Sequence, residues 1–315
     1  MKVRFWGVRG SIPTPLTINQ IQGKISSIAQ RLSPADLVSE ESIEKFLAML
    51  PPYLMGAVGG NTTCVEVRLN DDTIIIFDCG SGITDLAHAL KKEDRYIRTY
   101  HIFFSHFHWD HIQGLPFFVP IAYDPKCTIH FYSPIRNFED LLKNQMKVPY
   151  FPVTMDVMGA DISYHVLTEP IIRIGSSEVM WKRVKHPGGC FNYKVRENGN
   201  TLIFATDTEL TEQDFKKTKE NVDFYEDVDA IILDSQYTLG EAIEKYDWGH
   251  SSYSMAVDFV NEWAIKNLYL FHHEPQYDDK KIYSILQSAK WYMNHLDPDH
   301  DKNIYLAREN LEFDV

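Results

Sequence analysis

Ser105-His106-Phe107-His108-Trp109-Asp110-His111 is the most informative stretch of the chain. It directly follows the apolar run 102–104, which predicts a buried strand. Where a strand gives way to a tight loop, alternate side chains share a side, so the first two histidines can face one metal ion while Asp110 and His111 face a second. Imidazole and carboxylate groups suit zinc, manganese or iron. The stretch therefore predicts a metal site at the end of a strand.

Four loop residues do not complete two metal shells, so further ligands should follow other strands. His186, Asp207 and His272 each come shortly after an apolar run that predicts a strand. A single polar residue at a strand end more often faces solvent or caps a turn. Together with the first stretch, however, the three residues predict a complete site for two divalent metal ions.

Length and composition indicate a globular protein. The 315 residues allow one large domain or two small ones, and 44% of them are hydrophobic and 24% charged. No apolar run approaches the length of a membrane span, so we expect no membrane association. The first residues alternate apolar and polar side chains without the apolar core of a signal peptide, and we expect the protein in the cytoplasm.

The formal net charge of -13 bears on the substrate. Binding to a nucleic acid depends on clustered Lys and Arg side chains that release counterions, so a large nucleic acid is an unfavourable partner. A small anionic substrate is compatible with this charge, because metal ions reverse the local field at a site.

Short apolar runs predict strands along most of the chain. Helical patterns lie between several of them, which predicts an α/β fold with sheets covered by helices on their outer faces. The expected strands are 3–6, 64–69, 73–78, 102–104, 128–132, 179–184, 201–205, 230–234 and 268–271.

Residues 17–56 differ from the rest, because Ile21, Ile25, Ile28 and Leu32 follow helical spacing between two early strands. We interpret 17–56 as a helical insertion within a single domain of residues 1–315. Three roles stay open for it: packing on the core, a contact in a homodimer, or a lid over the site.

In its motifs the chain resembles the metallo-β-lactamase-fold hydrolases, and specifically their phosphodiesterase branch, which includes ribonuclease Z and cyclic-phosphate phosphodiesterases. The resemblance covers almost the whole chain, and the metal-binding elements occur in the family's order. The matching stretches are 5–13, 59–64, 77–82, 105–116, 186–189, 205–208, 248–252 and 271–275.

This resemblance implies an αββα sandwich with the site at one edge of the two sheets. It implies that one metal is held by His106, His108 and His186, a second by Asp110, His111 and His272, and that Asp207 bridges both. Zinc is the expected metal, with manganese or iron as alternatives. A water shared by the metals would lose a proton near neutral pH and attack phosphorus. Asp78 would orient a ligand.

The element Gly249-His250-Ser251-Ser252 resembles the Gly-His-Ser-Thr element of ribonuclease Z and favours a phosphodiester substrate. Through the resemblance, His250 would hold the phosphate or protonate the leaving oxygen, and Asp234 would orient and charge it. His250 could instead only cap a helix. His272 and His273 are adjacent, and only the family pattern favours His272. The histidines without such context are expected to be ordinary surface or core residues: His88, His101, His130, His165, His295 and His300.

The sequence therefore predicts a dinuclear metal-dependent hydrolase, with Asp110, His250 and Asp234 as catalytic residues and a small cyclic nucleotide or cyclic phosphate as substrate. Two alternatives stay open. One is a lactone or thioester hydrolase on the same metals, in which His250 would be dispensable. The other is a metal-binding sensor without turnover, assembled through the insertion.

Overall fold

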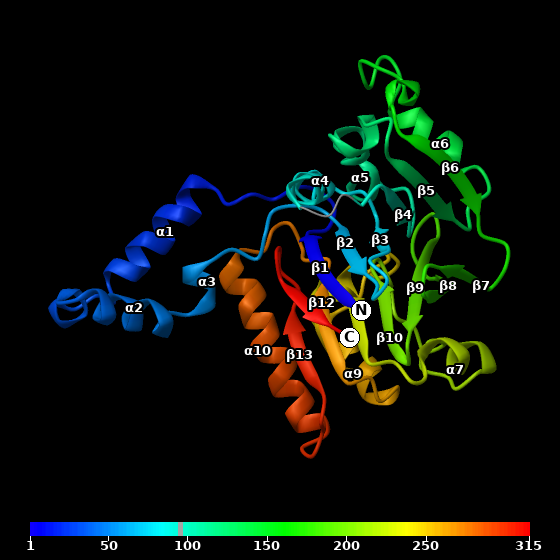
Figure 1. The fold of residues 1–315 in the computed structure, drawn as a ribbon. Coiled ribbons are helices and arrows are strands. Elements are labelled where there is room, and N and C mark those ends of the chain that lie inside the picture. Colours follow the sequence, from blue (N-terminus) through cyan, green and yellow to red (C-terminus); the bar gives the residue numbers. More distant parts are fainter. Residues whose placement is uncertain (94–96) are drawn as a thin grey trace.

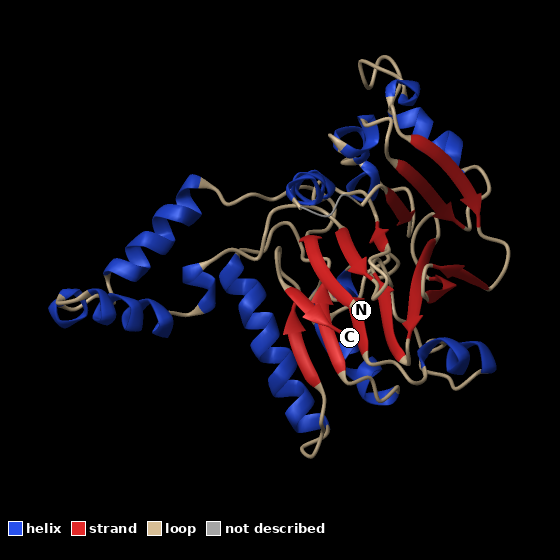
Figure 2. Cartoon of the chain, viewed as in Figure 1, coloured by secondary structure: helices blue, strands red, loops and turns tan. Residues whose placement is uncertain are grey.

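A computed structural model describes residues 1–93 and 97–315 of the chain. Over these residues the strands form two seven-stranded sheets that lie face to face, with helices outside them (Figures 1 and 2). None of the helices in this part of the chain is long and apolar enough to cross a membrane.

The first sheet has the strand order β14-β1-β2-β3-β4-β5-β6. Strands β3 to β6 run parallel, whereas β14, β1, β2 and β3 pair antiparallel. The strands are β1 (Lys2–Gly7), β2 (Cys64–Arg68), β3 (Ile74–Phe77), β4 (Thr99–Phe103), β5 (Thr128–Ser133), β6 (Asp161–Val166) and β14 (Glu312–Asp314).

The second sheet has the order β13-β12-β11-β10-β9-β8-β7. Strands β10 to β13 run parallel, and the remaining pairs are antiparallel. The strands are β7 (Ile171–Ile174), β8 (Ser177–Val184), β9 (Cys190–Glu197), β10 (Asn200–Ala205), β11 (Ala230–Asp234), β12 (Asn267–Phe271) and β13 (Asn303–Leu306). Every run that the sequence analysis assigned to a strand lies at one of these strands.

Helices connect the strands and cover both sheets. The α-helices are α1 (Ile18–Ala29), α2 (Glu40–Met49), α3 (Pro52–Met55), α4 (Ile83–Lys92), α5 (Trp109–Ile112), α6 (Phe138–Gln145), α7 (Lys219–Tyr225), α8 (Leu239–Glu244), α9 (Tyr253–Glu262) and α10 (Asp279–Leu296). The 3₁₀ helices are η1 (Pro34–Leu37), η2 (Leu115–Phe117), η3 (Ile121–Tyr123) and η4 (Met155–Val157).

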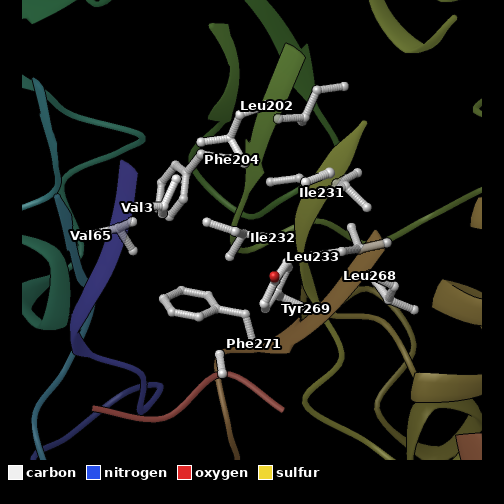
Figure 3. Close-up of a cluster of buried hydrophobic side chains, with 14 of the residues drawn as sticks. Val3, Val65, Leu202, Phe204, Ile231, Ile232, Leu233, Leu268, Tyr269 and Phe271 are labelled. Carbon is white, nitrogen blue, oxygen red and sulfur yellow. The ribbon is translucent and has the colours of Figure 1, made fainter. Parts of the chain in front are cut away.

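The main core lies between the sheets and is rich in aromatic rings. Phe77 of β3 stacks on Phe204 of β10 with ring centroids 4.8 Å apart, and Phe5 of β1 meets Phe271 of β12 at 5.8 Å. Figure 3 shows Val3 and Val65 of the first sheet on the same side of the second sheet as Phe204, Ile232 and Phe271. Burial of these side chains supplies most of the force that holds the two sheets together.

Two outer layers complete the sandwich. Helices α4 and α6 pack on the outer face of the first sheet, where Leu86 and Phe138 join a second apolar cluster. Helices α7, α9 and α10 lie over the second sheet and contribute apolar side chains to its core. The order helix, sheet, sheet, helix confirms the predicted αββα architecture.

Residues 17–56 contain α1, η1, α2 and α3 and project from the sandwich (Figure 1). We call this segment the arm. Thr17 caps α1 in a capping box with Gln20, and Ser39 caps α2 in the same way with Ser42. Helix α1 has no buried residue, although four isoleucines lie along it at helical spacing. The arm is thus locally well specified but leaves apolar surface exposed.

Candidate metal centre

The candidate ligands meet because the strands that carry them end at the same edge of the sandwich. Strands β4, β10 and β12 are parallel strands of their sheets, and their carboxyl ends lead to His106, Asp207 and His272. Strand β8 runs the same way as β10 and leads to His186. The carboxyl ends of parallel strands leave side chains free to converge on a ligand.

One set of candidate ligands contains three histidines and one aspartate. His106, His108, His186 and Asp207 each offer an atom within 4.8 Å of the others. Nε2 of His186 lies 3.1 Å from Nδ1 of His108 and 3.7 Å from Oδ1 of Asp207. Nε2 of His106 also lies 3.7 Å from Oδ1 of Asp207. These atoms surround a space that suits one cation with imidazole and carboxylate ligands.

A second set lies against the first, and Asp207 borders both of them. Asp110, His111 and His272 form the set. Oδ2 of Asp207 is 3.1 Å from Nε2 of His111 and 3.2 Å from Nε2 of His272. Oδ2 of Asp110 is 3.2 Å and 3.4 Å from the same two nitrogens. The two oxygens of Asp207 therefore face different sets, as a bridging carboxylate requires.

The chemistry of this donor set fits metal ions. Within the described part of the chain, the buried Nε2 atom of His106 makes no hydrogen bond, which is costly for an imidazole nitrogen. Burial, with the charge of His111, holds the pKa of His106 well below its usual value and so favours the neutral ring that binds metals. Burial would also lower the pKa of His111, but Asp207 and Asp110 outweigh it and hold that pKa well above its usual value. Such acidic surroundings favour a cation.

Hydrogen bonds behind the ligands fix their orientation. Oδ2 of Asp78 lies 2.8 Å from Nδ1 of His111, and the same carboxylate accepts hydrogen bonds from the backbone and hydroxyl of Ser105 at 2.7 and 2.6 Å. The carbonyl of Gly249 lies 3.0 Å from Nδ1 of His186. In both rings the occupied Nδ1 leaves Nε2 for the cluster, which is how outer partners set a histidine tautomer.

His250 lies beside the two sets. Its Nδ1 is 2.7 Å from Oδ2 of Asp234, the last residue of β11, and its ring stacks on that of His272 with centroids 5.0 Å apart. Burial alone would lower the pKa of His250, but the charge and hydrogen bond of Asp234 raise it to about 9. His250 also offers a nitrogen within 4.8 Å of Asp207 and His272. It is therefore close enough to act on a group bound at the cluster.

Three of the residues at this edge have a left-handed backbone. The φ angles of Asp78, Asp207 and His272 are +60°, +49° and +60°. This conformation is unusual for residues other than glycine and costs on the order of 1 kcal/mol or more when the side chain is large. It occurs where the chain leaves β3, β10 and β12. Asp110 is held differently, since its Oδ2 accepts a hydrogen bond of 2.7 Å from the backbone N–H of Ser11.

Glu209 is a residue of this site that the sequence analysis missed. Its carboxylate accepts hydrogen bonds from the backbone of Gly249 at 2.9 Å and of Asp247 at 3.3 Å. Nζ of Lys185 lies 2.5 Å from Glu209 and 2.6 Å from Asp247. The adjacency of Lys185 to His186, and of Glu209 to the Asp207 turn, is the signal that could have drawn attention to the pair.

The remaining histidines divide into several environments. His273 turns away from the cluster, with Nε2 2.8 Å from the carbonyl of Ala307, and burial lowers its pKa to about 3. His101, His130 and His165, on β4, β5 and β6, form a group of their own, in which Nδ1 of His130 lies 3.2 Å from Nε2 of His165. Of the adjacent pair, His272 is thus the one that the structure brings to the candidate ligands.

Comparison with known proteins agrees with this geometry. The family model described as the beta-lactamase superfamily domain matches residues 73–273. A curated ribonuclease Z from Picrophilus torridus is 22% identical over 292 residues, which cover 78% of this chain and 87% of that protein.

Solved structures share the fold over nearly the full length. The metallo-beta-lactamase fold protein YhfI from Bacillus subtilis has a TM-score of 0.64 at 14% identity, covering 99% of this chain and 98% of YhfI. The short form of human tRNase Z has a TM-score of 0.60 at 16% identity, covering 100% and 99% of the two chains.

Proposed function

The chain belongs to the beta-lactamase superfamily, and from this premise we propose that it is a two-metal phosphodiesterase that acts on a small cyclic nucleotide or cyclic phosphate. That it is a metal-dependent hydrolase of the phosphodiesterase type follows from its family and its relatives named ribonuclease Z. One observation carries the finer proposal. The two oxygens of Asp207 face two separate sets of histidines at 3.1 to 3.7 Å, and the paired His250 and Asp234 lie beside them.

We assign the ligands by the oxygen of Asp207 that each faces. His106, His108 and His186 would hold one cation with Oδ1, and Asp110, His111 and His272 would hold the other with Oδ2. Zinc is our first choice and manganese or iron the alternatives, since all three accept imidazole and carboxylate. Two cations in these positions would lower the pKa of a shared water and neutralise phosphoryl oxygens.

The protein side chains supply orientation and a proton. Asp78 and the carbonyl of Gly249 hold the rings of His111 and His186 with Nε2 toward the cluster. Asp234 occupies Nδ1 of His250, which leaves Nε2 of that ring for a phosphoryl or leaving oxygen. A histidine that keeps its proton at neutral pH can donate it as the leaving oxygen departs. His250 would therefore act as the general acid, positioned by Asp234.

The charge balance supports a small substrate. With a formal net charge of -13, the chain lacks the excess of Lys and Arg that grips a long phosphate backbone. A cyclic nucleotide or cyclic phosphate presents a single diester, which two cations and His250 can contact without further basic residues. Hydrolysis of a lactone or thioester on the same cations is the second candidate. In that reaction no phosphate ester is cleaved, so His250 would have no phosphate-ester oxygen to protonate.

The test is hydrolysis of bis(p-nitrophenyl) phosphate, followed by 2′,3′- and 3′,5′-cyclic nucleotides, with metal-loaded protein. We expect Asp207→Ala to be inert and His250→Ala to be slowed by about 10²- to 10⁴-fold, the usual contribution of a general acid. Asp227→Ala and His88→Ala are the controls, because Asp227 shares the left-handed backbone of Asp207 and both control residues are exposed.

Three results would contradict parts of the proposal. Turnover of lactones or thioesters with full activity in His250→Ala would point to the carbonyl-ester alternative. Cleavage of a precursor tRNA without any turnover of cyclic nucleotides would keep the phosphodiesterase chemistry and remove the small substrate. A fully metal-loaded protein inert toward every ester would instead fit the sensor that keeps its metals without using them.

A further inference from the structure

The arm of residues 17–56 exposes an unusual amount of apolar surface. In α1, Ile18, Ile21 and Ile25 are 74%, 45% and 61% exposed, although each is a large aliphatic side chain. The other large apolar side chains of the arm that are exposed to solvent are Leu32, Leu37, Val38, Ile43, Met49 and Met55. Apolar groups gathered on one projecting segment normally mark an interaction site.

The spacing of the isoleucines fits a helix as the partner. Ile18, Ile21, Ile25 and Ile28 follow one another at intervals of three, four and three residues, which is the a and d pattern of helices that pair side by side. Only Ile28 is packed against the small cluster formed by α2 and α3. The other three isoleucines of this stripe are exposed, so a second helix could pack against them.

The arm is fixed to the sandwich at its base. Lys24 forms an ion pair with Asp279 of α10, and Tyr53 meets Tyr283 with ring centroids 6.4 Å apart. Beyond these contacts the arm extends away from both sheets (Figure 1). A segment anchored in this way holds its apolar stripe outward.

We propose that the arm forms a homodimer, in which α1 of one copy packs antiparallel on α1 of the other around a twofold axis. Such an interface is self-complementary, because the same stripe serves both partners. The extent of the apolar surface agrees with this partner. At about 100 Å² each, the three exposed isoleucines of α1 supply roughly 300 Å², and an interface that buries about 800 Å² of each partner also includes the six exposed apolar side chains elsewhere in the arm.

Charge also favours a second copy at this place. The arm has three basic residues and four acidic ones, so it carries a net charge of only -1 out of the -13 of the chain. Two acidic copies would repel each other elsewhere, whereas the arms can approach closely. Within α1 the one charged residue is Lys24, and its charge is neutralised by Asp279. The same near-neutral composition disfavours an anionic membrane, which attracts helices rich in Lys and Arg.

Sedimentation equilibrium on the full chain tests the proposal. Twice the chain mass of 36.6 kDa, about 73 kDa, is expected for the wild type. The double variant Ile21→Glu, Ile25→Glu should sediment as a monomer, with the dissociation constant raised at least about 100-fold, because each partner would bury unpaired carboxylates. Both side chains are solvent-exposed, so the fold should persist, and circular dichroism checks this.

The matched control is Ile243→Glu on α8, whose side chain is 70% exposed but lies outside the arm. This variant should remain a dimer. In the variant Ile25→Cys, mild oxidation should give a disulfide-linked dimer, since the native cysteines are all buried and position 25 lies near the expected axis.

Three outcomes would overturn the proposal: a wild-type monomer up to about 100 μM, a dimer that survives the double variant, or a monomer that sediments with phosphatidylserine vesicles through α1. The readout is mass, so it does not depend on the proposed enzymatic activity.

Discussion

The carboxylate of Glu209 accepts a hydrogen bond of 2.9 Å from the backbone N–H of Gly249 and so ties the turn after β10 to the segment that carries His250. The carbonyl of the same glycine faces Nδ1 of His186 at 3.0 Å. One carboxylate thus positions a candidate ligand on one side and the proposed general acid on the other. Glu209 does not reach the cluster itself, and we regard it as a positioning residue.

Replacing Glu209 by glutamine should therefore slow catalysis without unfolding the protein. A hydrogen bond to a charged group contributes about 1.5 to 3 kcal/mol, which corresponds to about a 10- to 100-fold loss if it is transmitted to the reaction. We expect most of the loss in kcat and little in KM, measured on bis(p-nitrophenyl) phosphate. Glu212→Gln is the control, since its side chain is 85% exposed. An unchanged kcat would show that the 247–250 segment does not need Glu209.

Asp78→Asn should weaken the binding of one metal ion more than it lowers the stability of the fold. The asparagine keeps the size of Asp78 but loses the charge that faces Ser105 and Nδ1 of His111. Loss of such an outer partner typically reduces metal affinity about 10- to 100-fold. Competition with a chromogenic zinc chelator measures the two affinities. Asp85→Asn on α4 should leave both affinities unchanged. If Asp78→Asn bound both metal ions as tightly as the wild type, His111 would keep its orientation without this carboxylate.

Metal content should separate the two sets of ligands. Wild-type protein is expected to carry two zinc ions per chain by mass spectrometry of the metal, whereas His186→Ala and His272→Ala should each retain one. Asp207→Ala should retain neither firmly, because both cations would lose a ligand. Chelation should also lower the Tm of the wild type, since a ligand at 100 times its Kd stabilises by about 2.7 kcal/mol. A Tm that does not change on chelation would argue against bound metal in the native state.

A pH effect on stability is expected from Lys194, whose buried side chain donates hydrogen bonds to the carbonyls of Asp223 and Glu226 at the end of α7. Burial, with the charge of Arg196, lowers its pKa from 10.5 to about 8. Between these values the unfolded chain binds more protons than the native protein, so the free energy of unfolding rises with pH in this window. The contribution gained in this way is lost again as pH falls through 8.

The free energy of unfolding of the wild type, relative to Lys194→Met, should therefore increase by up to about 3 kcal/mol from pH 8 to above pH 10. Urea titrations at several pH values measure this difference, with Lys91→Met, on the exposed face of α4, as the control. A difference independent of pH would mean that Lys194 keeps an ordinary pKa in the native protein.

Much of the fold could be predicted because its central strands are short apolar runs. Strands such as β3 and β11 are buried on both faces, and their sequences are nearly continuous hydrophobic stretches. The strands that were missed carry polar residues for local reasons. Strand β9 is almost wholly buried yet contains Asn192 and Lys194, and edge strand β7 is half exposed. Neither has the apolar alternation by which strands are found.

The candidate ligands could be predicted because metal binding requires particular side chains, and these follow strands in the sequence. The parts that could not be predicted act through the backbone. The N–H of Ser11 that holds Asp110 belongs to a residue type without a distinguishing signature, and the partners of Glu209 lie about 40 residues away. Only the folded chain brings these groups together. In the same way, the sequence alone does not separate His272 from His273.

The left-handed backbone at Asp78, Asp207 and His272 lowers the stability of the fold at positions whose side chains serve the proposed metal site. Glycine adopts this conformation without steric cost, so the substitution of any of the three by glycine would relax the chain locally. Removal of buried carboxylates from a crowded acidic cluster would relieve it further when no metal is present. Selection for heat tolerance alone would therefore tend to erase this edge of the sandwich, and variants recovered from such a selection should be screened for metal content before any gain in Tm is accepted.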